Sequence, residues 1–314
     1  MFPHGSLNYI YGNNGAGKTS ILEALSVLSR GRSFRTSQPG ELTGPLDNTF
    51  RVFAESSDAE GHKHRIGLER SGSHWKGRVD GNDVRQLSQL SLLLPTVVME
   101  PDSHLLVGGA PENRRKYLDW GMFHVEHGFL ELWRNFSRAL KQRNAALRSG
   151  QENVLDSIDE VLAEYGNQLG HLRERHADKV SGLITGMLFD LKARVQNVEI
   201  HYEKGWKDES YLQALQTRRK RDLERGATGA GPHRADLRLL CNGVLARTVL
   251  SRGEQKAFAA AMLLTQVKLL GLADKNPVLL LDDLVSEFDQ EHFESVLTKS
   301  LEGGRQVWVT GTEA

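Results

Sequence analysis

The chain has 314 residues, 39% hydrophobic and 25% charged, which are ordinary fractions for a globular protein of about two domains. Its 40 basic residues balance 40 acidic ones, so bulk charge gives no sign of nucleic-acid affinity, and any such site must come from local clustering. The single cysteine allows no internal disulfide, and neither a signal peptide nor an apolar run of the ~20 residues of a membrane span is visible, so we expect a cytoplasmic protein without a membrane partner.

The first third of the chain combines strands and turns. Residues 7–11 are expected to form a strand, and residues 19–28 a helix, because their apolar side chains recur at helical spacing. Further strands are expected at residues 50–53, 65–68 and 95–99, with an Asp80-Gly81 hairpin turn before the last of them.

The middle third has a different texture. Residues 112–148 and 153–192 are charged and helically periodic, with breaks at Gly150 and Gly166 and no sustained heptads. A packed helical lobe is therefore expected rather than a coiled coil. Residues 226–232 are glycine-rich and indicate a flexible junction.

The last third returns to alternating elements. Strands are expected at residues 236–240, 278–281 and 306–310, and helices at residues 253–270 and 290–299. The alternating elements predict an α/β fold class: a head with a mixed or parallel sheet, plus an inserted and mostly helical lobe. The expected division is 1–109 for the first part of the head, 110–228 for the helical lobe and 229–314 for the rest of the head.

A phosphate-binding motif follows the first strand. Residues 12–19 match G-x-x-x-x-G-K-[ST] in full, between an expected strand and an expected helix. We expect Lys18 to reach the β- and γ-phosphates of ATP and Thr19 to bind Mg²⁺, while backbone N–H groups surround the phosphates. The alternative, a glycine-rich turn with an incidental lysine, does not explain this context. The expected nucleotide-binding residues are Gly12, Asn13, Asn14, Gly15, Ala16, Gly17, Lys18, Thr19 and Ser20.

Two carboxylates end the apolar run at residues 278–281. Such a run is typical of a parallel strand that is covered on both faces, and ligands bind beyond the carboxyl ends of such strands. We expect Asp282 to hold Mg²⁺ and Asp283 to orient or deprotonate the attacking water. The alternative is that the pair only caps the next turn.

Two further segments have both a nucleotide-related and a structural interpretation. Ser251 precedes a helix, with Glu254 three residues later, and this spacing is typical of a capping box. Beside the other motifs the segment also matches an ABC signature, in which Ser251 and Gly253 would contact the γ-phosphate held by a second copy. Residues 286–289 fit either the interface D-loop of that class or a plain helix cap.

Basic residues cluster locally despite the neutral total. The clusters are Arg30, Arg32 and Arg35; Arg114, Arg115 and Lys116; Lys141 and Arg143; and Arg218, Arg219, Lys220 and Arg221. Each could contact DNA phosphates, but solvated helix faces with interleaved acids are the favoured interpretation.

With these motifs in place, the chain resembles the RecF family of bacterial recombination proteins, which are ABC-type ATPases related to SMC heads. The matching stretches are Phe2, Gly5, Asn8 and Ile10 before the phosphate loop, residues 31–36, residues 107–119, residues 231–236, the segment around Ser251 and residues 281–289. The resemblance implies an ATP-dependent DNA-binding protein of replication, recombination, repair and the SOS response. It also implies an ATP-dependent homodimer with slow, switch-like hydrolysis. Such a dimer would bind double-stranded DNA and gapped or single-strand junctions, and act at gaps and stalled forks with RecO and RecR.

Three departures from the family pattern give further expectations. The strand-rich segment that normally precedes the position of Phe2 is absent, so the chain is expected to be a shortened version. Glu100 lies near the place of a Mg²⁺-binding glutamine, and we do not assign it that role. Thr310 falls where transporters carry a histidine, which predicts different γ-phosphate sensing.

Three rival functions share part of this pattern. A transporter ATPase subunit has the same motifs, but it places them much closer together than Lys18 and Ser251. An SMC-type protein would carry a long heptad segment where residues 112–225 lie. An ATP-gated scaffold without turnover predicts the same motifs and stays open.

Overall fold

The computed structural model describes residues 1–36, 38–43, 49–57, 61–72 and 74–312. Its contacts divide the chain into two compact units. The strand-rich unit comprises residues 1–103, 190–193 and 270–314, and the helical unit comprises residues 104–189 and 194–269. Each unit is described by itself.

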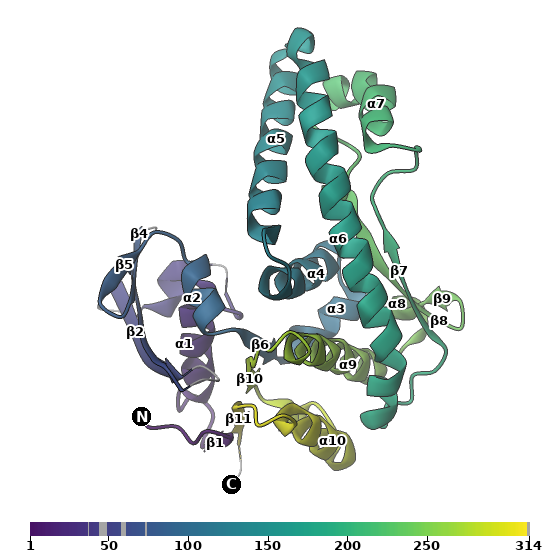
Figure 1. Ribbon diagram of the computed structural model, residues 1–314. Coiled ribbons are helices and arrows are strands. Elements are labelled where there is room, and N and C mark those ends of the chain that lie inside the picture. Colours follow the sequence, from purple (N-terminus) through teal and green to yellow (C-terminus); the bar gives the residue numbers. More distant parts are fainter. Residues whose placement is uncertain (37, 44–48, 58–60, 73, 313–314) are drawn as a thin grey trace. The chain divides into compact units, whose positions relative to one another are not determined.

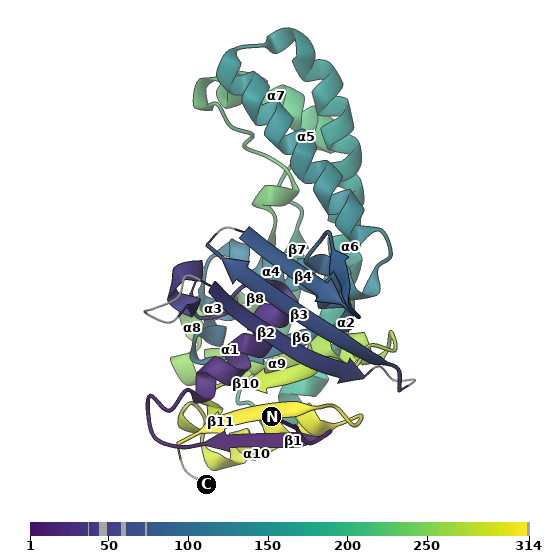
Figure 2. The ribbon, with the colours of Figure 1, turned by 90° about the vertical axis from the view of Figure 1, so that its left-hand side faces the viewer.

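A four-stranded parallel sheet forms the centre of the strand-rich unit (Figures 1 and 2). Its order is β1 (Leu7–Tyr11), β11 (Val307–Gly311), β10 (Val278–Leu281) and β6 (Thr96–Met99). Leu22 of α1 (Lys18–Arg30) packs with Leu280 and Trp308 in the core. The expected strand at residues 278–281 is confirmed, and its last three residues are fully buried, as an all-apolar parallel strand requires.

A second sheet of this unit is antiparallel. It consists of β2 (Thr49–Ser57), β3 (Lys63–Ser71), β4 (His74–Val79) and β5 (Asn82–Val84), and the expected Asp80-Gly81 turn joins the last two. One face packs Ile66 and Leu68 against α1 and against Leu90 of α2 (Ser88–Leu93). The unit is completed by α10 (Gln290–Leu301) and the short turns η1 (Pro39–Leu42) and η5 (Leu284–Ser286), and η2 (Pro101–His104) ends at the boundary.

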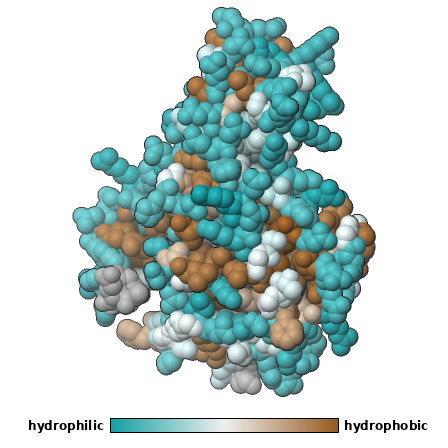
Figure 3. All heavy atoms as spheres, turned by 45° about the vertical axis from the view of Figure 1, so that its right-hand side comes forward, coloured by the Kyte–Doolittle hydropathy of each residue, from teal (hydrophilic) through white to brown (hydrophobic). Residues whose placement is uncertain are grey.

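Three helices form an elongated arm in the helical unit (Figure 1). They are α5 (Phe129–Ser149), α6 (Leu155–Asp190) and α7 (Tyr211–Arg225), with η3 (Glu152–Val154) in the α5–α6 turn. The face shown in Figure 3 is mostly hydrophilic over the distal arm. No helix among the described residues is both long enough and apolar enough to cross a bilayer.

The rest of the helical unit is built from shorter elements. The helices are α3 (Leu105–Gly108), α4 (Pro111–Val125), α8 (Ala246–Val249) and α9 (Arg252–Gly271), whose last two residues belong to the other unit. A three-stranded antiparallel sheet contains β7 (Val198–Glu203), β8 (Asp236–Cys241) and β9 (Val244–Leu245), and η4 (Pro232–Arg234) precedes β8.

Gly166 does not break its helix, contrary to the expectation from sequence. α6 continues through it, and a Cβ atom at this position would lie 2.4 Å from a ring carbon of Tyr211. The glycine therefore gives room to the fully buried Tyr211 ring, whose hydroxyl donates to the Ala230 carbonyl at 3.0 Å. Gly231 also leaves room for this side chain, because a Cβ there would lie 2.1 Å from the Tyr211 hydroxyl oxygen.

The expected flexible junction at residues 226–232 is instead tightly held. The Thr228 N–H donates to Asn144 Oδ1 at 2.8 Å, and the Gly229 N–H donates to Asp222 Oδ1 at 3.1 Å. The glycines are required by close packing against Tyr211 and Arg218, so the expectation of flexibility was wrong.

Candidate functional site

The loop between β1 and α1 has the conformation that a phosphate-binding loop requires. Gly15 and Gly17 have φ values of 81° and 85°, which only glycine adopts freely. Gly17 is the N-cap residue of α1, and no described side chain caps this helix start. Because residues 13–17 are exposed, the first-turn N–H groups of α1 face an open loop and suit an anion.

Lys18 lies over this loop. Its ammonium donates to the Gly12 carbonyl at 2.7 Å and to the Asn13 carbonyl at 3.0 Å. Those are weakly competing neutral acceptors, so an incoming phosphate can take over the charge. These two hydrogen bonds therefore keep the Lys18 ammonium at the loop instead of letting it extend into solvent.

Asp282 accepts hydrogen bonds from two hydroxyl groups that lie far from it in the sequence. Thr19 Oγ1 donates to Asp282 Oδ1 at 2.9 Å, and Thr310 Oγ1 donates to the same oxygen at 2.8 Å. Asp282 is 6% exposed and lies directly after β10, while Thr310 lies on β11. The structure thus brings Thr19 and Asp282, the two expected Mg²⁺ ligands, into contact.

Asp283 has a left-handed backbone, with φ at 52°. Its N–H donates to Thr310 Oγ1 at 2.9 Å, and its carboxylate accepts from Ser286 Oγ at 2.9 Å. Thr310 therefore contacts the Asp282 carboxylate directly and positions the backbone of Asp283. Sequence reasoning considered Thr310 only as a replacement for a histidine, and its position at the end of a parallel strand was the available signal.

Glu100 is a third carboxylate at this edge of the sheet. It follows β6, the strand paired with β10. Burial raises its pKa to about 7, and the negative charges of Asp102 and Asp282 contribute in the same direction. Arg30 opposes this shift, and its guanidinium also donates to the Thr96 carbonyl at 2.7 Å.

The donor set suits Mg²⁺ but does not form a complete cage. Thr19 and Asp282 offer hard oxygen ligands, which Mg²⁺ prefers. Among the described residues no group of three His, Cys, Asp or Glu side chains could hold a metal alone. Most Mg²⁺ ligands would therefore come from phosphate oxygens and water, as is usual for nucleotide sites.

Ser251 and Gly253 lie in the helical unit, exposed at the start of α9. The predicted capping box is present: the Ser251 hydroxyl and N–H both donate to Glu254 Oε2, at 2.7 and 2.8 Å, and the Glu254 N–H returns a bond to Ser251 Oγ at 3.3 Å. These bonds lower the pKa of Glu254. A Cβ at Gly253 would meet nothing within 4 Å, so this helix start is open to a ligand.

At residues 286–289 the structure shows the features of the helix-cap interpretation. Asp289 is the N-cap residue of α10, and its Oδ1 accepts from the His292 N–H at 2.9 Å. The D-loop interpretation stays a prediction.

Two arginines of the expected basic clusters are buried. Arg114 makes a bidentate pair with Asp236, at 2.7 and 3.1 Å, and donates to the Gly109 carbonyl at 2.9 Å. Arg143 is fully buried. Neither guanidinium is accessible to a DNA phosphate in this structure, and neither lies on a solvated helix face as favoured from the sequence.

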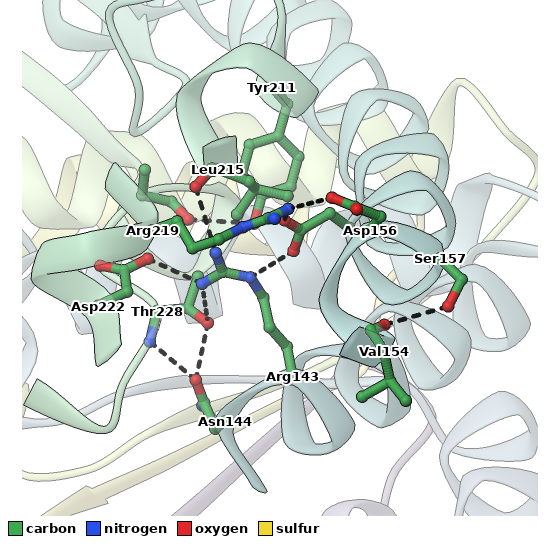
Figure 4. A network of polar contacts seen from close by, with 12 residues as sticks. Arg143, Asn144, Val154, Asp156, Ser157, Tyr211, Leu215, Arg219, Asp222 and Thr228 are labelled. Atoms are coloured by element: carbon green, nitrogen blue, oxygen red, sulfur yellow. Dashed lines mark hydrogen bonds and ion pairs between the residues drawn. The ribbon is translucent and has the colours of Figure 1, made fainter. Parts of the chain in front are cut away.

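Arg143 is the centre of a network that we call the arm network (Figure 4). Its guanidinium donates to Asp159 Oδ1 at 2.6 Å, to Asp222 Oδ2 at 2.7 Å and to Thr228 Oγ1 at 3.0 Å. Arg219 pairs with Asp159 Oδ2 at 2.9 Å from the solvent side. The network joins α5, α6 and α7 to the segment after α7.

Two arginines donate hydrogen bonds to backbone carbonyls just before β8. Arg173 donates to the Pro232 carbonyl at 2.7 Å and forms a bidentate pair with Asp119 at 2.8 Å. Arg115 donates to the Ala235 carbonyl at 2.7 Å. The runs at residues 107–119 and 231–236, which carry part of the family resemblance, thus contact each other through Arg114 and Arg115.

Comparisons with known proteins identify the family of this chain. The family model of the RecF/RecN/SMC N-terminal domain matches residues 2–313. A "DNA replication and repair protein RecF" of Stenotrophomonas maltophilia is 41% identical, over 100% of this chain and 88% of the relative. The protein of the same name from Shewanella frigidimarina is 38% identical, over 99% of this chain and 87% of the relative.

Solved structures give the same result at the level of the fold. The structure of the recombination mediator protein RecF with ATP in the RecFOR pathway has a TM-score of 0.90 and 28% identity, over 100% of this chain and 88% of that one. An SMC head bound to the C-terminal winged-helix domain of ScpA has a TM-score of 0.56 at 14% identity, over 99% of this chain and 83% of that one. The second likeness concerns the fold alone.

Proposed function

Because the chain belongs to the RecF proteins of the RecF/RecN/SMC family, we propose that it is an ATP-dependent DNA-binding protein of replication and recombinational repair. ATP binds at residues 12–20. The observation that carries this proposal is the contact of Thr19 and Thr310 with Asp282, next to an open phosphate loop. A relative of known fold is described with ATP, which supports the same ligand.

Each residue at the phosphate loop has a role that follows from its position. The Lys18 ammonium leaves the Gly12 and Asn13 carbonyls and pairs with the β- and γ-phosphates. Thr19 and Asp282 hold Mg²⁺, which neutralises developing charge on the phosphates when it is bound. Asp283 orients the attacking water and accepts its proton, and Thr310 positions Asp283 through the backbone.

Hydrolysis is slow and serves as a conformational switch in this proposal. Ser251 and Gly253 of a second copy complete the site, so ATP joins two copies head to tail. A ligand that binds only across the interface stabilises the dimer by mass action. The open helix start at Ser251 supports this role, because its hydroxyl donates to Glu254 within the same capping box and, among the described residues, no atom would meet a Cβ at Gly253 within 4 Å.

The relatives' names support a biological role in DNA replication and repair. Proteins called DNA replication and repair proteins match this chain over its length, and one solved relative is placed in the RecFOR pathway. We propose that the dimer acts at gapped DNA and stalled forks, in the cytoplasm, and helps RecO and RecR to load recombinase.

Sedimentation with and without ATP, and with and without DNA, tests the proposal. The wild-type chain should dimerise with ATP and Mg²⁺. Lys18→Ala should lose both nucleotide binding and the dimer, whereas Ser251→Arg should bind ATP but stay monomeric. Ser251→Arg that dimerises like wild type would show that the signature does not act in trans.

An ATP-gated scaffold differs from this proposal in one measurement. It predicts the same dimerisation, but no phosphate release in any condition. Phosphate release that DNA stimulates would exclude the scaffold and, because no membrane is needed, also the transporter subunit.

A further inference from the structure

The antiparallel sheet of the strand-rich unit has one face that packs on α1 and α2 and one that does not (Figure 2). We call the second face the outer sheet face. At strand ends this face includes Thr49, Ser57, Ser71 and His74. Its remaining residues alternate along the strands with the buried ones and are Arg51, Phe53, Glu55, Lys63, Arg65, Gly67, Glu69, Lys76, Arg78 and Asp83. Eight of these ten side chains are charged, and one is a large aromatic ring.

Phe53 is 68% exposed, although its neighbours Val52 and Ala54 turn inward to the core. Its cross-strand partner is Gly67, and a Cβ there would lie 3.9 Å from Phe53 Cδ2. The ring therefore lies beside a backbone that carries no side chain. One edge of the ring is shielded by the glycine, and most of its surface remains available to a flat apolar ligand.

Cations lie in the cross-strand rows on both sides of Phe53. One cross-strand row contains Arg51, Glu69 and Lys76, and the next row beyond Phe53 contains Glu55 and Arg65. Adjacent rows on one face of a strand are about 7 Å apart. Phe53 itself shares a row with Gly67 and Arg78, so a ligand stacked on the ring would have a cation on three sides.

The charge balance of this face favours an anionic ligand. Arg51, Lys63, Arg65, Lys76 and Arg78 are five cations, and Glu55, Glu69 and Asp83 are three acids, which leaves two positive charges on a chain whose total is zero. The acids pair with arginines through exposed side chains, as in Arg51–Glu69 and Arg78–Asp83. Exposed pairs of this kind contribute little, so phosphates can displace them.

We propose that the outer sheet face binds single-stranded nucleic acid, with one unpaired base stacked on Phe53 and the flanking phosphates on Arg51, Arg65 and Lys76. The bases of a duplex stack on each other and cannot reach the ring, so the face selects unpaired strands. Base–aromatic stacking on a cationic surface is independent of sequence. This inference rests on the proposed function, and it adds a strand-selective surface in addition to the nucleotide site.

Polarisation of a labelled single-stranded oligothymidylate, compared with a labelled duplex of the same length, tests this surface. Phe53→Ala should weaken single-strand binding at least about fivefold and leave duplex binding unchanged. Phe53→Trp should retain binding, and its added indole emission should be quenched by the oligonucleotide. Phe189→Ala, which removes a phenylalanine that is 83% exposed on α6, is the matched control and should change neither affinity.

A charge variant tests the same surface in a second way. Lys76→Gln should reduce the slope of log affinity against log salt by about 0.7 for the single strand. If Phe53→Ala proves unstable, the Phe53→Trp variant still tests the surface through quenching of its indole emission by the oligonucleotide.

The outcomes separate this inference from the proposed function. If the wild-type chain binds ATP but no DNA of either kind, the proposed function fails. If it binds the single strand and Phe53→Ala binds it equally well, only the outer sheet face is excluded. Loss of a protein partner with Phe53→Ala, at unchanged single-strand affinity, would assign this face to a protein and overturn the inference.

Discussion

The phosphate-loop cluster and the arm network both join segments that lie far apart in the sequence, but they differ in how completely their charges are matched. In the arm network, the guanidinium groups of Arg143 and Arg219 meet the carboxylates of Asp159 and Asp222, and all of these except Arg219 are buried. In the other cluster, Asp282 accepts hydrogen bonds from two neutral hydroxyl groups and makes no ion pair among the described residues, while Lys18 donates to two backbone carbonyls. We therefore expect the charge-matched network to stabilise the fold and the unmatched charges to bind a charged ligand.

This difference predicts which kind of damage each mutation does. Changes in the arm network should alter the free energy of unfolding and leave nucleotide chemistry alone. Changes at the phosphate loop should alter nucleotide binding or hydrolysis and leave the free energy of unfolding unchanged. The following mutations test that separation, from the largest expected effect to the smallest.

Arg143→Ala should lower the free energy of unfolding by about 3–5 kcal/mol, because it leaves the Asp159 and Asp222 carboxylates buried without their cation. Urea unfolding followed by circular dichroism measures the change. Lys141→Ala, an exposed position on the same helix, is the control and should stay within about 0.5 kcal/mol of wild type. A loss below about 1 kcal/mol for Arg143→Ala would remove the structural role of the network.

Asp283→Asn should slow phosphate release at least about 100-fold, because the amide cannot accept a proton from water. Stability should be unchanged, since asparagine tolerates the φ of 52° at this position and its oxygen still accepts from Ser286. Phosphate release and thermal melting are measured on the same sample. The comparison breaks if the variant melts earlier but hydrolyses ATP at the wild-type rate.

His233 should make stability depend on pH. Burial lowers its pKa to about 4 from an ordinary 6.5, while its Nε2–H donates to the Thr228 carbonyl at 2.9 Å. Below pH 6.5 the unfolded chain takes up the proton first, so stability should fall between pH 6.5 and 4 by on the order of 2 kcal/mol.

His233→Gln tests this dependence, because glutamine keeps a donor and does not titrate. Unfolding measured at pH 7 and pH 4.5 should show a smaller difference in this variant than in wild type. An identical difference in both proteins would assign the pH dependence to other groups, such as the buried His176.

Arg219→Ala should cost less than about 1 kcal/mol, although Arg219 contacts Asp156 and Asp159. Its guanidinium is partly exposed, so solvent screens its pairs, and Asp159 keeps its hydrogen bond from Arg143 when Arg219 is absent. Urea unfolding beside Arg143→Ala sharpens the comparison within the network. An equal loss in both variants would mean that the outer arginine is as important as the buried one.

Local patterns predicted the parts of the fold that depend on neighbouring residues. Residues 278–281 form a buried strand as expected, and the glycines before Lys18 adopt the conformation that the phosphate-loop pattern requires. Ser251 and Glu254 form the predicted capping box because that motif is closed within four residues. The roles of Lys18, Asp282 and Asp283 toward a nucleotide stay predictions, as does the three-part division of the chain.

The failures of sequence reasoning share a cause. Arg143 was placed in a basic cluster because its acidic partners are 16 and 79 positions away. Gly166 was expected to end a helix because nothing nearby shows that Tyr211 fills its place. The break before α5, where Gly128 has a φ of 82°, and the separate helix α7 were likewise not predicted. Tertiary partners decide these positions, and a single sequence does not reveal them.

Tyr211 lies against two glycines that are 65 positions apart, one inside α6 and one just before η4. Neither glycine can gain a methyl group while the phenol ring stays, and the ring cannot shrink without leaving a void between them. Loss of the Tyr211 ring should therefore make alanine or serine tolerable at Gly166, whereas Gly231 should stay glycine, because its φ of 130° strains any side chain. A mutational library that varies Gly166 and Tyr211 jointly should recover stable variants that single changes at Gly166 do not give.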